Sequence, residues 1–138
     1  MKHLSLAAVT DFSGGLLGAG CPEDKVNSVS TDTRTLCEGA LFVALRGENF
    51  DGHDFIATAI DAGAVAVMID MERKGNNPEG CAVVRVEDTH GALQLLARNY
   101  RMDLGLTCIG ITGSNGKTTT KDFVASVLSE EFSVSATV

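Results

Sequence analysis

The chain has 138 residues, 44% of them hydrophobic and 21% charged, so it is long enough to bury a core and has a globular composition. Its formal net charge of −7 argues against a nucleic-acid-binding protein, for which a basic surface is expected. No apolar run approaches the length of a membrane span, and the N-terminal segment lacks the apolar region of a signal peptide.

The hydrophobic pattern predicts alternating strands and helices before residue 102. A short helix is expected after a cap at Ser5, ending at Gly14 and Gly15. Strands are expected at residues 26–30, 40–45, 65–69 and 82–86, and helices at 54–62 and 89–101. The predicted inward-facing helix residues are Leu6, Val9 and Phe12; Phe55, Ala59 and Ala62; and Leu93, Leu96, Ala97 and Tyr100. This alternation indicates an α/β domain with some parallel pairing, and residues 102–105 are the predicted linker.

The most specific motif is the glycine-rich stretch at residues 112–120. An apolar run at 106–111 predicts a strand before it, residues 121–130 predict a helix after it, and 132–138 predict the start of another strand. Strand, glycine-rich turn and helix form a phosphate cradle of backbone N–H groups at a helix N-terminus. In such a P-loop Lys117 would reach the β- and γ-phosphates of a nucleotide, and the Thr118 hydroxyl would bind Mg²⁺. The spacing is shorter than the general template, so a ligand-free turn remains an alternative.

Two polar clusters follow predicted strands and could share one sheet edge. The first is Ser-Thr-Asp-Thr-Arg at residues 30–34, and the second spans residues 46–55. Each also has a simpler interpretation, because aspartates make local turns and an exposed arginine makes surface ion pairs. His53 fits the start of a helix better than a catalytic base. Residue chemistry alone therefore leaves binding and local structure both open.

The four cysteines lie far apart in the sequence and near no histidine cluster. They are Cys21, Cys37, Cys81 and Cys108. Such spacing favours reduced thiols over disulfides or a metal site. We therefore expect a cytoplasmic protein.

The order of the motifs resembles the Mur ligases, the ATP-dependent enzymes that build the peptide of bacterial peptidoglycan. The matching residues are Ser-Thr-Asp-Thr-Arg at 30–34, Glu-Gly-Ala-Leu-Phe-Val-Ala-Leu-Arg-Gly at 38–47, Phe-Asp-Gly-His-Asp-Phe at 50–55 and Thr-Gly-Ser-Asn-Gly-Lys-Thr-Thr at 112–119. Residues 48–50 and Lys121-Asp122 most resemble the member that joins D-alanyl-D-alanine to UDP-N-acetylmuramoyl-tripeptide.

The resemblance implies a small mixed-sheet N-terminal substrate domain at residues 1–104, followed at 105–138 by the first βαβ unit of a P-loop ATPase domain. It implies UDP-sugar binding by Thr31, Asp32, Thr33, Arg34, Gly47, Glu48, Asn49 and Phe50. Asp51, Gly52 and His53 would shape the turn beyond them. ATP binding would fall to Gly113, Ser114, Asn115, Gly116, Lys117, Thr118 and Thr119, with Lys117 as the catalytic residue.

In such a ligase ATP phosphorylates the carboxylate of the tripeptide, and the amine of the dipeptide then displaces phosphate from the acyl phosphate. Lys117 would stabilise the transferring phosphate and Thr118 would ligate Mg²⁺. The resemblance places further ligands and domains beyond residue 138, so we expect no ligase activity from this chain alone. Unpaired sheet edges would favour its self-association.

Three alternatives stay open. One is a sister Mur ligase that adds the third amino acid and shares the phosphate loop. Another is a non-catalytic module that binds a nucleotide sugar and does not hydrolyse ATP. The third is an unrelated P-loop kinase or GTPase, which the position of the loop after a full domain disfavours.

Overall fold

The computed structural model describes residues 4–73 and 77–137 and divides the chain into two compact units, Met1–Gly105 and Leu106–Val138. No described helix is long and apolar enough to cross a membrane. The elements in chain order are β1 (Leu4–Ser5), α1 (Leu6–Ser13), β2 (Leu16–Ala19), β3 (Lys25–Val26), β4 (Ser28–Ser30), β5 (Ala40–Val43), the 3₁₀ helix η1 (Gly52–Phe55), α2 (Ile56–Asp61), β6 (Ala64–Asp70), β7 (Ala82–Val86), α3 (Thr89–Asp103) and α4 (Lys117–Leu128).

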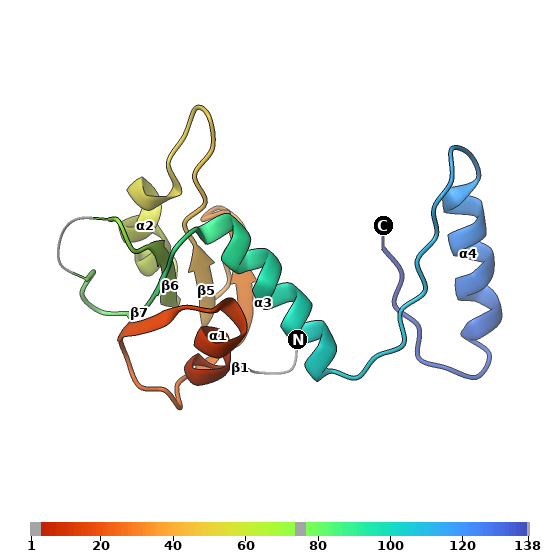
Figure 1. Ribbon diagram of the computed structural model, residues 1–138, viewed down its shortest axis with the longest axis horizontal. Coiled ribbons are helices and arrows are strands. Elements are labelled where there is room, and N and C mark those ends of the chain that lie inside the picture. The colour runs from red at the N-terminus through yellow and green to blue at the C-terminus, as the bar shows by residue number, and fades with distance from the viewer. Residues whose placement is uncertain (1–3, 74–76, 138) are drawn as a thin grey trace. The chain divides into compact units, whose positions relative to one another are not determined.

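A mixed sheet lies at the centre of the first unit (Figure 1). Its described strands follow the order β2-β7-β6-β5-β4, in which β7, β6, β5 and β4 are parallel and β2 runs antiparallel at one edge. Strands β1 and β3 form a separate antiparallel pair. The predicted α/β class with a mixed sheet is confirmed.

Both faces of the parallel strands are covered by helices. Along β5, Leu41 and Val43 enter a core cluster with α1 and α3, while Phe42 and Ala44 enter a second cluster with α2. All four side chains are buried. Strands buried on both faces need a mostly apolar sequence, which is why the sequence indicated β5, β6 and β7.

The first predicted helix is confirmed, and two other predictions need correction. The Ser5 hydroxyl accepts the N–H of Ala8 at 3.2 Å and caps α1, as expected. The strand predicted at 26–30 is instead split, because the N–H of Asn27 turns to the carbonyl of Gly39 and the chain changes sheets there. The half-exposed strand β2 was missed, because four residues with a glycine among them give no periodic pattern.

The helix faces were predicted in part. Ala59 and Leu96 are buried, but Phe55, Ala62 and Ala97 are exposed. Residues 52–55 form a 3₁₀ turn rather than the first α-helical turn, so Ile56 takes the inward position assigned to Phe55.

The second unit contains the helix α4, which begins at Lys117 rather than at residue 121. The strands predicted at 106–111 and 132–138 are not formed in the described residues, and Val138 lies outside them. A strand requires a ladder of hydrogen bonds to a neighbour, and no described segment supplies one to either. The assignment of the two units as substrate and ATPase domains stays a prediction.

Candidate functional site

Two polar loops of the first unit lie at the carboxyl ends of its parallel strands. Residues 31–34 follow β4 and residues 47–50 follow β5, and these two strands are parallel neighbours. Both predicted substrate loops therefore leave the same edge of the sheet, where ligands of open α/β sheets bind. No hydrogen bond or ion pair joins one loop to the other within the part of the chain that the structure describes.

The first loop is organised by a turn around Asp32. Its carboxylate accepts the backbone N–H of Arg34 at 2.9 Å and the guanidinium Nη2 at 2.5 Å. The side-chain bonds from Arg34, followed by its backbone N–H, lower the pKa of Asp32 to about 2. The Arg34 side chain is 86% exposed, so the turn presents its guanidinium to solvent. Thr31 is exposed and Thr33 half-buried.

The second loop is a hairpin that follows β5. An antiparallel bridge joins Arg46 to Asp51, and the N–H of Gly47 donates to the carbonyl of Phe50 at 2.9 Å. The predicted substrate residues at its exposed tip are Gly47, Glu48, Asn49 and Phe50. We call residues 46–52 the substrate hairpin.

Gly52 closes the base of the substrate hairpin. It is buried, and its N–H donates to the carbonyl of Leu45 at 2.8 Å. A Cβ at this position would lie 2.6 Å from Leu45 O, 2.8 Å from Leu45 N and 3.0 Å from the carbonyl carbon of Ala44. All three are backbone atoms, so only glycine fits without moving the chain.

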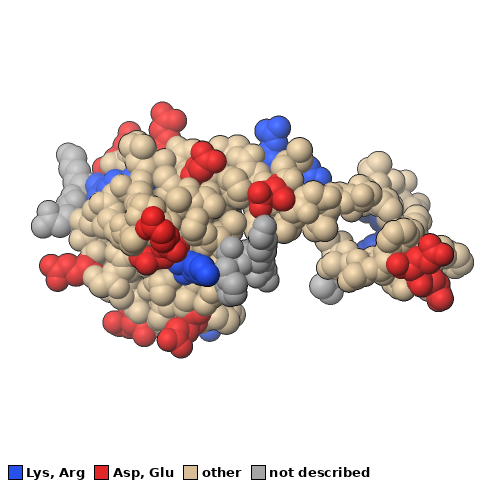
Figure 2. All heavy atoms as spheres, turned by 90° about the horizontal axis from the view of Figure 1, so that it is seen from below, with Lys and Arg blue, Asp and Glu red and all other residues tan. Residues whose placement is uncertain are grey.

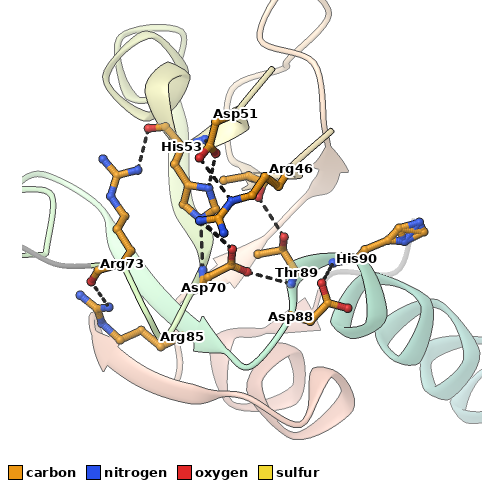
Figure 3. A network of polar contacts seen from close by, with 10 residues as sticks. Arg46, Asp51, His53, Asp70, Arg73, Arg85, Asp88, Thr89 and His90 are labelled. Atoms are coloured by element: carbon orange, nitrogen blue, oxygen red, sulfur yellow. Dashed lines mark hydrogen bonds and ion pairs between the residues drawn. The ribbon is translucent and has the colours of Figure 1, made fainter. Parts of the chain in front are cut away.

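A buried histidine connects the hairpin to the sheet (Figure 3). The Nδ1 of His53 lies 2.6 Å from Asp51 Oδ1, and its Nε2 lies 3.1 Å from the backbone N of Asp70. Asp51 also accepts the backbone N–H of His53 at 2.9 Å and pairs with Arg46 Nε at 3.3 Å. The backbone N–H of His53, then its side chain and Arg46, hold the pKa of the Asp51 carboxyl below its usual value.

Asp70 and Thr89 extend these contacts to the start of α3 (Figure 3). Asp70 Oδ1 accepts the N–H of Thr89 at 3.0 Å, and the Thr89 hydroxyl donates to the carbonyl of Ala44 at 2.9 Å. Arg46 Nη2 lies 3.4 Å from Asp70 Oδ2. Asp70 and Thr89 are both buried.

Sequence reasoning did not find Asp70, and it placed Thr89 only at the start of the helix predicted at 89–101. The cap of α3 is in fact Asp88, whose carboxylate accepts the N–H groups of His90 and Gly91. One feature could have indicated Asp70: it is the first charged residue after a continuous apolar run. In a parallel sheet that position is at the ligand-facing edge.

The phosphate loop of the second unit ends at Gly116, which precedes the first turn of α4 with φ +76°. No side chain caps this helix end, so its first N–H groups are open to an anion. The Nζ of Lys117 donates to the carbonyl of Gly113 at 2.6 Å and thus folds over the loop. An uncapped N-terminus beside a lysine fits a phosphate group.

The predicted Mg²⁺ ligand, Thr118, lies exposed in this first turn. The described residues contain no group of three or more His, Cys, Asp or Glu side chains that could hold a metal. Thr118 alone can supply one hydroxyl ligand, and Mg²⁺ is commonly bound by few protein ligands together with phosphate oxygens and water. The metal role of Thr118 stays a prediction.

The first unit shows no broad positive surface on the face in Figure 2. On the face in Figure 2, the described Asp and Glu side chains are scattered over the first unit, and Lys and Arg do not gather into one continuous patch. A phosphate approaching this unit therefore depends on local donors such as loop N–H groups and single arginines rather than on a broad positive field.

Comparison with known proteins identifies the family. The family model described as "Mur ligase family, catalytic domain" matches residues 25–101, which is more than half of the chain. The chain belongs to the Mur ligase family. The model described as "Mur ligase middle domain" matches residues 111–138, which include the phosphate loop.

Among curated Mur ligases, the chain is 49% identical over 112 residues to UDP-N-acetylmuramoyl-tripeptide--D-alanyl-D-alanine ligase of Bacillus subtilis. That alignment covers 81% of this chain and 24% of the relative, so the chain spans about a quarter of the relative's length. The ligase of Chlorobium phaeobacteroides named for adding 2,6-diaminopimelate is 40% identical, over 75% of this chain and 20% of the relative.

Solved Mur ligase structures share the fold. A MurF structure from Acinetobacter baumannii matches with a TM-score of 0.81 and 31% identity, over 95% of this chain and 28% of that one. A MurF ligase from Thermotoga maritima in complex with ADP matches with a TM-score of 0.64 and 37% identity, over 77% of this chain and 24% of that one.

Proposed function

We propose that this chain supplies the nucleotide-sugar site and the ATP-phosphate loop of a ligase that joins D-alanyl-D-alanine to UDP-N-acetylmuramoyl-tripeptide. The observation that carries the proposal is the 49% identity to the Bacillus subtilis ligase of that name across four-fifths of the chain. The 40% identity to a diaminopimelate-adding ligase supports the sister reaction less. As the family resemblance implies, we place the reaction in the cytoplasm.

In this proposal the two loops at the sheet edge hold the UDP-sugar. Asp32 engages Nε and Nη2 of Arg34, and the remaining N–H groups of this exposed guanidinium would donate to a diphosphate. The hairpin tip adds the amide of Asn49 and exposed backbone groups, which suit a uracil or ribose edge.

The phosphate loop has the second role. The N–H groups at the start of α4 would receive ATP phosphate oxygens, and Lys117 would exchange its contact with Gly113 for a phosphate. Charge neutralisation of the transferring group is the chemistry that a lysine and a metal ion supply in phosphoryl transfer. The ADP complex of the Thermotoga maritima relative supports nucleotide binding in this family.

Calorimetric titration tests the nucleotide-sugar site. We expect saturable binding of UDP-N-acetylmuramoyl-tripeptide, weakened about tenfold or more by Arg34→Ala or Asn49→Ala, since each removes a polar contact. Thr58→Ala, an exposed change on α2, is the matched control and should bind as the unchanged chain does. Absence of heat at millimolar ligand would refute nucleotide-sugar binding by this chain.

A second titration separates the two ligases. The precursor that ends in L-alanyl-D-glutamate is the substrate in the sister ligase's name, and the tripeptide precursor is one residue longer. We expect the tripeptide precursor to bind at least as tightly. Clear preference for the shorter precursor would favour the sister reaction.

A further inference from the structure

We propose that His53 is the positioning residue of the substrate hairpin. Held as the neutral tautomer with its proton on Nδ1, it ties the hairpin to the end of β6 and, through Asp70, to the start of α3. The link to binding rests on the function proposed above, in which the hairpin tip contacts the nucleotide sugar. That His53 holds the hairpin in place is argued from the hydrogen bonds alone.

The contacts fix the tautomer. A backbone amide can only donate, so the 3.1 Å contact from the N–H of Asp70 requires Nε2 of His53 to be the acceptor and to carry no proton. In a neutral ring the proton then resides on Nδ1, which donates to Asp51 Oδ1 at 2.6 Å. Both ring nitrogens are therefore engaged, and the ring is not available as a general base.

The bonds form a closed circuit around the root of the hairpin (Figure 3). They run from Asp51 to His53, to Asp70, to Thr89 and to Ala44, which directly follows β5 and lies two residues before the hairpin. The hairpin is thus held at both of its ends, by Ala44 before it and by Asp51 within it.

The circuit is buried at His53, Asp70 and Thr89 and half-buried at Asp51. The side chain of His53 is 3% exposed and that of Asp70 is 10% exposed. Among the described residues, no buried side-chain nitrogen or oxygen lacks a hydrogen-bond partner. Fully satisfied buried polar networks rigidify the segments they join, which is the property a loop needs in order to present Glu48 and Asn49 in one orientation.

Two conservative variants test the hydrogen bonds of the two ring nitrogens of His53 separately. In His53→Asn the side-chain amide can replace the Nδ1 donor to Asp51, but nothing accepts the N–H of Asp70. In His53→Gln the longer side chain can replace the Nε2 acceptor for Asp70, but the donor to Asp51 is lost. Both variants lose one hydrogen bond, so overall destabilisation alone should not distinguish them.

The first experiment is amide hydrogen exchange by NMR on the ligand-free 138-residue chain. His53→Gln should speed exchange of the hairpin amides of Gly47 and Gly52 about tenfold relative to His53→Asn, because loss of one charge-assisted bond changes a local opening equilibrium by about that factor. His53→Asn should instead speed exchange at Asp70. Val9→Ala, a change at a buried residue of α1, is the control and should raise exchange without this selectivity.

The second measurement is the tautomer of the His53 ring. Nitrogen-15 spectra of the unchanged chain should show His53 as the neutral tautomer protonated at Nδ1. A ring protonated at Nε2, or equal hairpin exchange in the two variants, would overturn the positioning role.

Titration with UDP-N-acetylmuramoyl-tripeptide then connects the hairpin to binding. We expect His53→Gln to bind about tenfold more weakly than His53→Asn. Equal affinities in the two variants would overturn the link between hairpin position and binding. If the unchanged chain gives no saturable heat, the proposed function fails, while the exchange experiment still decides the role of His53.

Discussion

Asp70 offers the sharpest test of how the strand ends are held together. Its Oδ1 accepts the buried N–H of Thr89 at 3.0 Å, and its Oδ2 lies 3.4 Å from Arg46. Asp70→Asn keeps an oxygen for Thr89 and removes only the ion pair, whereas Asp70→Ala removes both acceptors. The difference between the two variants therefore isolates the bond to α3, together with the volume of the lost amide.

The magnitudes follow from burial. The Arg46 side chain is 54% exposed, so loss of that pair should cost within about 1 kcal/mol. A buried N–H left without an acceptor costs about 1–3 kcal/mol, so Asp70→Ala should be less stable than Asp70→Asn by about 2 kcal/mol. With a urea m-value of about 1.5 kcal/mol/M for a small protein, this corresponds to a midpoint lower by about 1.3 M.

Urea unfolding followed by tyrosine fluorescence is the assay. The chain has one tyrosine, Tyr100, and no tryptophan, so the signal reports on α3. Glu87→Ala removes an exposed carboxylate just after β7 and serves as the control, with an expected change within about 0.5 kcal/mol. Equal midpoints for Asp70→Ala and Asp70→Asn would refute the reasoning that this bond holds α3 to the sheet.

Three further predictions concern single residues of the loops. Gly52→Ala should lower stability by about 1–3 kcal/mol in urea unfolding, because its Cβ would meet the backbone of Leu45 at 2.6 Å; an unchanged midpoint would contradict this. Arg34→Gln should raise the pKa of Asp32 from about 2 toward 3.8, measured by carbon-13 NMR of the carboxyl group. Because the pKa of Asp32 is lower in the folded state, the contribution of this turn to stability is present above pH 3.8 and is lost as the pH falls toward 2. If the substitution left the pKa of Asp32 unchanged, the Arg34 side chain would not be the cause of the low pKa. Gly116→Ala should weaken Mg·ATP binding about five- to thirtyfold in calorimetry, because φ +76° costs a residue with a Cβ about 1–2 kcal/mol. Unchanged affinity would separate the loop conformation from phosphate binding.

The family and the main strands were accessible from the sequence. Strands β5, β6 and β7 are mostly apolar because helices cover both faces of the sheet, so hydrophobicity indicated their positions despite Arg85 within β7 and Asp70 at the end of β6. The helix α1 could also be predicted from the sequence, because Ser5 and Gly14 mark its ends by local hydrogen bonding and backbone geometry. Residues 112–120 could be predicted as a phosphate loop because the groups that such a loop needs lie close together in the chain.

Other features depended on long-range pairing. Residues 26–30 form two strands rather than one because Asn27 and its flanking residues pair with different neighbours. The local sequence pattern does not indicate this pairing. The same holds for β2, whose existence depends on the edge of β7. Strands at 106–111 and 132–138 were predicted from apolar content, but a strand exists only when a partner completes its hydrogen bonds.

The sequence by itself indicated the family, and it predicted two substrate loops and one phosphate loop, because each is a short run of residues whose side chains and backbone act together. Only the tertiary structure revealed that His53, Asp70 and Thr89 close a circuit of hydrogen bonds around the substrate hairpin. These residues are separated in the chain and meet because parallel strands bring their carboxyl ends to one edge. Local sequence thus specified the groups available for binding, and the strand order determined which of them support one another.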